Sequence, residues 1–384
     1  MQNFVHRNPV KIRFGRGQIA HLAQEVPPGA RVLMTYGGGS IRANGVYDQV
    51  LQALEGFEVL TFGGIEPNPR YPTLMRAVEL ARAEQVDFLL AVGGGSVLDG
   101  TKFIAAAIPF EGDPWTICSE QAPIRSAVPL GAVLTLPATG SEMNRAGVVS
   151  RDDTRQKLAF FSELLFPRFS ILDPETTFSL PPRQVGNGIV DGFTHVMEQY
   201  LTYPVGALLQ DRMAEAILQT LIEVGPQTLA DPTDYEARAS FMWCCTVALQ
   251  GLVGVGVPQD WSTHAIGHEL TVLHGLDHGQ TLAVILPAVM EAQREGKRAK
   301  LLQYAERVLG IRDGSDDERI DAAIAGTRSF FESVGVPTRL SAYGLSGDPS
   351  EEVVRKLIAR GVLPLGERDD LDAARIGALV SAAC

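Results

Sequence analysis

Short apolar runs alternate with helical patterns along the first 175 residues of the chain. The runs are Arg31–Tyr36, Val59–Phe62, Phe88–Val92, Ala132–Leu136 and Phe169–Leu172. Each is flanked by Gly, Pro or Asn, which is typical of buried strands, and the segments between them, such as Thr73–Gln85, repeat apolar residues with the period of a helix. Strands that alternate with helices predict a mostly parallel, Rossmann-like sheet, with ligands at the carboxyl ends of its strands.

The pattern changes after Asp173-Pro174, where strand-like runs become rare and long helical patterns follow. These patterns cover Asp211–Ile222, Glu236–Gly251, Lys297–Leu309, Glu318–Val334 and Glu351–Arg360. The pair Pro181-Pro182 is typical of a helix start or a hinge. We therefore expect a dinucleotide-binding α/β domain over residues 1–177 and an all-helical domain over residues 178–384.

Composition and charge exclude several classes of protein. The chain has 384 residues, with 33 Lys and Arg against 45 Asp and Glu, so its net charge is −12. Without a basic tract, neither nucleic acid nor an anionic membrane surface is an expected partner. The apolar runs are too short to span a membrane, and the N-terminus lacks the apolar core of a signal peptide. Four cysteines without CxxC spacing indicate neither a disulfide framework nor a thiolate zinc site, and we expect a cytoplasmic protein.

The glycine loop Gly93–Ser96 stands between a predicted strand and a predicted helix. Glycines allow close approach of the backbone to a ligand, and the free N–H groups at a helix start favour a phosphate. The loop matches neither GxGxxG nor GxxxxGK[ST], so it indicates a diphosphate only in general terms. A tight turn without a ligand is the alternative.

A second glycine loop, formed by Gly37, Gly38, Gly39 and Ser40, follows the first predicted strand pattern. Proteins that bind NAD commonly carry an acidic residue near this position, which accepts a hydrogen bond from the ribose 2′-hydroxyl. The loop has no acidic side chain, and Arg42 follows closely. This composition favours NADP(H) over NAD(H).

Five of the seven histidines fall between residues 195 and 278. Asp191 and His195 are four residues apart, as are His264 and His268, so each pair shares a helix face. His274 and His278 follow in a glycine-containing segment. Imidazoles together with a carboxylate suit Zn²⁺ or Fe²⁺. The chain lacks the HExxH motif of zinc proteases, the GxSxG motif of serine hydrolases and the YxxxK pair of short-chain reductases, so hydrolysis is not the expected chemistry.

Longer motifs run nearly end to end. They are FGRGQI (14–19), TYGGGS, FGGIEPNP (62–69), LLAVGGGSVLDGTKF, TLPATGSE (135–142), LPPRQV and GVPQDWSTHAIGHELTVLHGLDHGQTLAVILP. Together with the Asp191/His195 segment, they resemble the iron-containing (group III) alcohol dehydrogenase family, and within it the branch of NADPH-dependent aldehyde reductases and butanol dehydrogenases. The resemblance implies an architecture like that of dehydroquinate synthase.

The resemblance also assigns site residues. The family's metal ligands fall on Asp191, His195, His264 and His278, and its additional active-site histidine falls on His268. Its cofactor positions fall on Asn68, Gly94, Gly95, Ser96, Asp99, Thr135, Thr139 and Lys157, with Gly37–Ser40 in the form seen in members that use NADP(H). Gly186 and Gly192 stand where alanine is more usual, and we expect each to weaken its helix by about 1 kcal/mol.

The function implied is hydride transfer between NADPH and short-chain aldehydes such as butanal, with a divalent metal (iron or zinc) polarising the carbonyl oxygen. A homodimer is also implied. A lyase related to dehydroquinate synthase is one alternative, although Val257–Pro287 contains no Lys or Arg to hold a multiply anionic substrate. A catalytically silent protein that binds a nucleotide or a metal is the other alternative.

Overall fold

The computed structural model describes residues 1–384, and the chain forms two compact units. The α/β unit comprises Arg7–Leu180 and Pro232–Met242, and the helical unit comprises Met1–His6, Pro181–Asp231 and Trp243–Cys384. The chain thus passes into the helical unit at Pro181, three residues after the start of the predicted second domain. A single cut does not describe the division, because residues 1–6 and 232–242 each belong with the unit distant in sequence.

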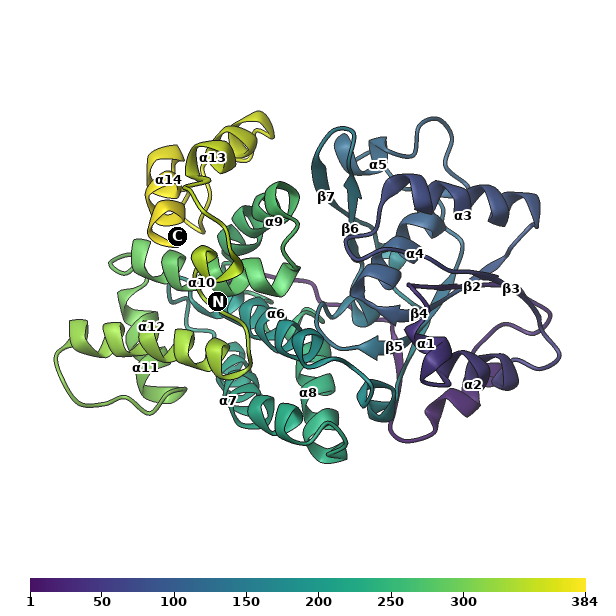
Figure 1. Cartoon of the computed structure of the whole chain (residues 1–384), viewed down its shortest axis with the longest axis horizontal. Helices are drawn as coiled ribbons and strands as arrows, with labels where there is room; N and C mark the ends of the chain where they lie inside the picture. The colour runs from purple at the N-terminus through teal and green to yellow at the C-terminus, as the bar shows by residue number, and fades with distance from the viewer. The chain divides into compact units, whose positions relative to one another are not determined.

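A six-stranded sheet forms the centre of the α/β unit (Figure 1). Its strands are β1 (Lys11–Phe14), β2 (Arg31–Tyr36), β3 (Glu58–Phe62), β4 (Phe88–Gly94), β5 (Leu130–Leu136) and β8 (Phe169–Leu172). They lie in the order β1-β8-β5-β4-β2-β3, and every neighbouring pair is parallel. The strands β6 (Ala146–Arg151) and β7 (Gln156–Phe161) form a separate antiparallel pair.

Helices cover both faces of the sheet. The α-helices of this unit are α1 (Ser40–Ala43), α2 (Val46–Ala53), α3 (Tyr71–Ala83), α4 (Gly95–Ala107) and α5 (Thr116–Ser119), and its short 3-10 helices are η1 (Gln18–Gln24), η2 (Ser141–Met143), η3 (Glu163–Leu165) and η4 (Pro174–Thr177). On β4, Leu89 and Ala91 join the core formed with α3 and α4. Phe88, Leu90 and Val92 join the core formed with η1, α1 and α2. Successive side chains of a strand point to opposite faces, so one strand supplies both cores.

The five strand patterns and the parallel sheet expected from the sequence are confirmed. The sequence patterns did not indicate β1, β6 and β7. The edge strand β1 carries Lys11 and Arg13 between its apolar residues, and β7 leaves Phe161 exposed. Strands that are buried on one face only, or that lie at an edge, lack the continuous apolar run that marks a central parallel strand.

The helical unit consists of long helices (Figure 1). They are α6 (Pro182–Tyr200), α7 (Leu208–Ala230), α8 (Tyr235–Ala248, which begins in the α/β unit), α9 (Ser262–His274), α10 (His278–Ala292), α11 (Arg298–Arg307), α12 (Asp316–Ser333), the 3-10 helix η5 (Leu340–Tyr343), α13 (Ser350–Ala359) and α14 (Ala373–Ala382). The predicted helix start at Pro181-Pro182 is confirmed, since Pro182 is the first residue of α6. The helix α10 packs against α6, α9, α12 and α14. None of the helices combines the length and hydropathy needed to cross a membrane.

Gly186 and Gly192, two of the three glycines of α6, stand at close contacts with neighbouring segments, so the expected loss of helix stability is only part of their effect. A Cβ atom on Gly186 would lie closer to the carbonyl oxygen of Val334 than real Cβ atoms approach. A Cβ atom on Gly192 would lie 2.8 Å from Sγ of Cys245. Glycine therefore allows the neighbouring chain to approach α6, and this packing compensates for its low helix propensity.

Candidate metal and cofactor sites

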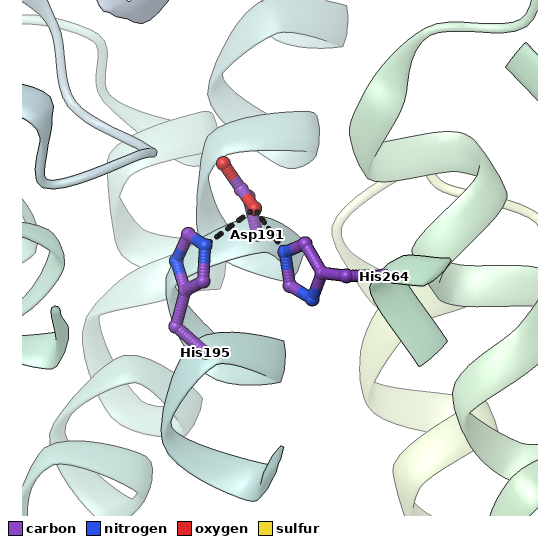
Figure 2. A group of neighbouring side chains, drawn as sticks. All are labelled: Asp191, His195 and His264. Atoms are coloured by element: carbon purple, nitrogen blue, oxygen red, sulfur yellow. Dashed lines mark ion pairs between the residues drawn. The ribbon is translucent and has the colours of Figure 1, made fainter. Parts of the chain in front are cut away.

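Three imidazoles surround one carboxylate oxygen in the helical unit. The Oδ1 atom of Asp191 lies 3.5 Å from Nε2 of His195, 3.7 Å from Nε2 of His264 and 3.6 Å from Nε2 of His278. Asp191 and His195 lie one turn apart on α6, His264 lies in the first turn of α9, and His278 is the first residue of α10. Figure 2 shows the rings of His195 and His264 on opposite sides of the Asp191 carboxylate.

The donor atoms of this group fit a divalent metal ion. The Oδ1 atom of Asp191 and the Nε2 atom of His264 are buried without a hydrogen-bond partner, which is costly for polar atoms. Ligand bonds of 2.0–2.2 Å in tetrahedral geometry separate neighbouring ligand atoms by about 3.4 Å, close to the spacing around Asp191. One oxygen with three imidazole nitrogens is a donor set that suits zinc and iron.

The electrostatic environment also favours a cation. Burial raises the pKa of Asp191, but His195, His278 and His264 outweigh this effect, so the pKa lies below its usual range and the group is a carboxylate. Burial lowers the pKa of His195 to about 4, against the influence of Asp191, so this ring is neutral and able to coordinate. Burial also lowers the pKa of His264, but Glu198 and Asp191 together raise it to about 9. Two carboxylates therefore create a negative field at the His264 ring.

Glu198 orients the His264 ring. Its Oε2 atom contacts Nδ1 of His264, and its Oε1 atom accepts a hydrogen bond of 3.1 Å from the backbone N–H of the same residue. A carboxylate on the far nitrogen of a histidine ligand sets the tautomer and directs the other nitrogen to the metal. Sequence analysis did not identify Glu198, although Asp191, His195 and Glu198 follow the i, i+4, i+7 spacing of one helix face.

The two remaining histidines of this region, His268 and His274, lie in different surroundings. The ring centroid of His268 lies 6.2 Å from that of His264 and 5.2 Å from that of His278, so His268 lies beside the residues grouped around Asp191. His274 is the exposed last residue of α9. Of the five histidines that cluster in the sequence, His274 is therefore the one that lies outside the group around Asp191.

Several of the predicted cofactor residues come together around the β4–α4 loop in the α/β unit. A Cβ atom on Gly94 would lie 2.8 Å from Cβ of Leu136, and one on Gly95 would overlap the side chain of Thr139. The backbone N–H of Asn68 donates to Oγ of Ser96 over 3.2 Å. Only glycine fits at Gly94 and Gly95, because Leu136 and Thr139 pack directly against the backbone at the start of α4. Thr135 lies on the neighbouring strand β5 and is buried.

Asp99 and Lys157 belong to a polar network behind this loop. The Oδ1 atom of Asp99 accepts a hydrogen bond of 2.6 Å from Oγ of Ser141, and its Oδ2 atom accepts one of 3.0 Å from the backbone N–H of Val148. Burial raises the pKa of Asp99, whereas Lys102, Ser141 and Lys157 oppose the shift. Both oxygens of Asp99 thus bind the protein itself, so Asp99 holds the surroundings of the loop in place.

The loop Gly37–Ser40 follows β2, the neighbour of β4 in the sheet. Both glycine loops therefore lie at the carboxyl ends of adjacent parallel strands. Beside the Gly37–Ser40 loop, Arg42 donates a hydrogen bond of 2.8 Å to the hydroxyl of Tyr36, and its guanidinium lies 3.7 Å from the ring centroid of Tyr47. The two tyrosines hold a cation close to the loop.

Known proteins match the whole chain. The model described as "Iron-containing alcohol dehydrogenase" matches residues 9–174, and "Fe-containing alcohol dehydrogenase family, C-terminal" matches residues 186–383. The chain belongs to the iron-containing alcohol dehydrogenase family. Among its members, "NADPH-dependent aldehyde reductase YqhD" of Escherichia coli (strain K12) is 60% identical over 374 residues, 97% of each chain.

Other members of the iron-containing alcohol dehydrogenase family are also similar. "Probable NADH-dependent butanol dehydrogenase 1" of Bacillus subtilis (strain 168) is 40% identical over 94% of this chain and 95% of its own. A crystal structure of E. coli K-12 YqhD has a TM-score of 0.99 at 57% identity, covering 100% of this chain and 99% of its own. The resemblance to the family and the fold expected from the sequence are thus confirmed.

Proposed function

We propose that this chain is a metal-dependent, NADPH-linked aldehyde reductase that acts on short-chain aldehydes such as butanal. The reaction converts an aldehyde, NADPH and a proton into an alcohol and NADP⁺. The single observation that carries this proposal is the Asp191 carboxylate faced by three imidazole nitrogens, in a chain 60% identical to an NADPH-dependent aldehyde reductase. Such a group suits a Lewis-acid reaction better than hydrolysis, since the chain has no HExxH base.

The proposed ligands of the metal, iron or zinc, are Asp191, His195, His264 and His278. Bound there, the ion supplies a Lewis acid that stabilises negative charge developing on the carbonyl oxygen as hydride arrives. The chain's own contribution is orientation, because Glu198 holds His264 and burial keeps His195 neutral. We propose that residues 178–384 hold the metal and the substrate.

The proposed cofactor site lies in residues 1–177. Gly94, Gly95 and Ser96 would bind the diphosphate at the start of α4, with Asn68, Thr135 and Thr139 around it, and Asp99 and Lys157 supporting the loop. Gly37, Gly38, Gly39 and Ser40 would leave room for the 2′-phosphate of NADPH, and Arg42 would add a positive charge. This second loop supports NADPH over NADH, although relatives at 37–40% identity are named NADH-dependent.

His268 is the proposed proton relay, since its ring lies beside His264 and His278. The variant His268→Ala should lower kcat while its metal content stays at the wild-type level. Wild-type turnover in that variant would remove the role. The lyase alternative is disfavoured because Val257–Pro287 has no Lys or Arg for a multiply anionic substrate.

The decisive experiment measures NADPH oxidation with butanal before and after chelation, with NADH in parallel. We expect turnover that prefers NADPH, is lost on chelation and returns with zinc or iron. The variant Asp191→Ala should lose the metal, whereas Asp211→Ala, a carboxylate that contacts Lys300 instead, should keep it. If the metal-loaded protein shows no NADPH oxidation with butanal or any other aldehyde tested, the proposed reaction is wrong.

We further propose that the chain is a homodimer, as the family resemblance implies. Sedimentation equilibrium of the purified protein measures this directly. A mass close to that of one 41.4 kDa chain at micromolar concentration would refute it.

A further inference from the structure

A lysine and two carboxylates form a buried cluster in the helical unit, outside the proposed ligands. The side chains of Lys297 and Glu367 are 3% and 2% exposed, and that of Asp260 is 4% exposed. The Nζ atom of Lys297 lies 2.9 Å from Oδ2 of Asp260, and it donates 2.6 Å hydrogen bonds to Oε2 of Glu367 and to the carbonyl oxygen of Leu201. The ammonium of Lys297 thus lies close to oxygen atoms from three separate segments of the chain.

Asp260 connects this cluster to the start of α9. Its Oδ1 atom accepts a 3.0 Å hydrogen bond from the backbone N–H of Ser262, the first residue of α9, and it also contacts the Ser262 hydroxyl. The first N–H groups of a helix have no partner within the helix, and a carboxylate there is stabilised by the helix dipole. Lys297 therefore holds the carboxylate that accepts from the first N–H group of the helix bearing His264.

A second connection runs through Glu198. The backbone N–H of Asp260 donates a 2.8 Å hydrogen bond to the carbonyl oxygen of Glu198, whose carboxylate holds both the backbone and the ring of His264. The first turn of α9 is thus fixed by two carboxylates, from Asp260 and Glu198. Of these two carboxylates, only the one of Asp260 forms an ion pair with Lys297.

We propose that Lys297 and Glu367 are positioning residues that hold Asp260 against the start of α9. Through α9 they keep Nε2 of His264 aimed at Oδ1 of Asp191, and so they set the affinity of the site for its metal. The proposal rests on the proposed metal site and adds to it the residues that maintain its geometry. Removal of an outer partner of a histidine ligand commonly lowers metal affinity by roughly 10- to 100-fold.

The charge balance of the cluster indicates which substitutions are tolerated. The carboxyl groups of Asp260 and Glu367 share the ammonium of Lys297, so one positive charge faces two buried carboxyl groups. Burial raises the pKa of Glu367 against the effect of Lys297, whereas the burial of Asp260 is outweighed by Lys297 and Ser262, so the pKa of Asp260 lies below its ordinary value. A neutral side chain is therefore tolerated more readily at residue 367 than at residue 260. A glutamine there can still accept the hydrogen bond from Nζ of Lys297, whereas an alanine cannot.

The test compares two lysines near the start of α11. Lys297→Met removes the ammonium from Asp260, while Lys300→Met removes an equally buried ammonium that pairs with Asp211 and lies 4.6 Å from the ring centroid of Tyr200. The readout is the dissociation constant for Zn²⁺ in competition with a chromogenic chelator, with thermal unfolding of the metal-free proteins in parallel. We expect Lys297→Met to bind at least tenfold more weakly and Lys300→Met to stay within about threefold of wild type. Equal affinities in the two variants would overturn the proposal.

A second pair decides the matter if Lys297→Met does not fold. Glu367→Gln should retain wild-type Zn²⁺ affinity, and Glu367→Ala should weaken it by tenfold or more, because only glutamine keeps Lys297 and Asp260 in place. Equal affinity in both Glu367 variants would refute the positioning role. Asp191→Ala separates this failure from that of the metal site: if it binds Zn²⁺ as wild type does, the metal site itself is wrong.

Discussion

Gly186 offers a direct test of how closely the helical unit is packed around α6. Its substitution by alanine sets two effects of opposite sign against each other. Alanine in a helix interior is favoured over glycine by roughly 1 kcal/mol of helix propensity. A Cβ atom at residue 186, however, would lie under 3.0 Å from the carbonyl oxygen of Val334 and 3.1 Å from Cγ2 of Val336.

The contact with Val334 decides whether Gly186→Ala raises or lowers the free energy of unfolding. Val334 is 1% exposed and ends α12, where its N–H binds the carbonyl oxygens of Phe330 and Phe331. The carbonyl of Val334 shares its peptide unit with the N–H of Gly335, which donates a 3.0 Å hydrogen bond to the carbonyl oxygen of Glu332. A carbonyl held in this way cannot rotate away as a side chain can, so α6 and the end of α12 must separate. Overpacking of this kind costs about 1–3 kcal/mol, and we expect Gly186→Ala to lower the free energy of unfolding by about 1–2 kcal/mol after the gain in helix propensity.

Urea unfolding followed by far-UV circular dichroism measures this change. The matched control is Gly377→Ala in α14, where an added Cβ atom would meet nothing closer than Cγ2 of Val354 at 3.9 Å. That variant should gain roughly 1 kcal/mol of stability. If Gly186→Ala proves as stable as wild type or more so, the close approach of Val334 to α6 is wrong.

Three further predictions follow from the structure. Gly38→Asp, at a position where nothing lies within 4 Å of an added Cβ atom, should lower the ratio of kcat/KM for NADPH to kcat/KM for NADH at least tenfold, because the new carboxylate repels a 2′-phosphate. Gly38→Asn should leave this ratio near that of wild type, and equal ratios in the two variants would contradict the assignment of the loop. Burial raises the pKa of both Cys118 and Cys244 to about 12, so iodoacetamide at pH 8 should modify Cys384 and spare both, and equally rapid labelling of Cys118 by mass spectrometry would refute this. Because folding raises the pKa of Cys118, this thiol contributes stability that is present below the ordinary thiol pKa of about 9 and is lost as the pH rises toward 12. The urea midpoint of Cys118→Ala should therefore fall less steeply than that of wild type over this pH range. An equally steep fall in both proteins would contradict this account.

The central sheet is predictable from the sequence because its strands are buried on both faces. Phe88–Val92 is entirely buried, so every position of this run is apolar and the strand is visible without its neighbours. The edge strand β1 alternates polar and apolar residues over only four positions, and β6 and β7 each combine a short apolar run with polar residues at one end. Patterns this short do not distinguish a strand from a loop. The order of the strands also depends on crossovers that no local pattern specifies.

The site divides in the same way. Local helical spacing places Asp191 with His195 and His264 with His268, since residues four apart share a helix face. The tertiary structure alone brings α6, α9 and α10 together, so that His278 joins the group and His274 faces away from it. Nothing local distinguishes those two histidines.

The sequence by itself therefore determined the parallel sheet, the two glycine loops and the pairs of metal-ligand type, because each is a property of a short segment. The tertiary structure decided which ligand atoms converge, why Gly186 must lack a side chain, and that Lys297 and Glu367 hold the start of α9. These features join residues up to 148 positions apart, as between Gly186 and Val334. Their energies arise from close packing and burial of charge, which depend on what lies across the contact and not on what lies beside it in the chain.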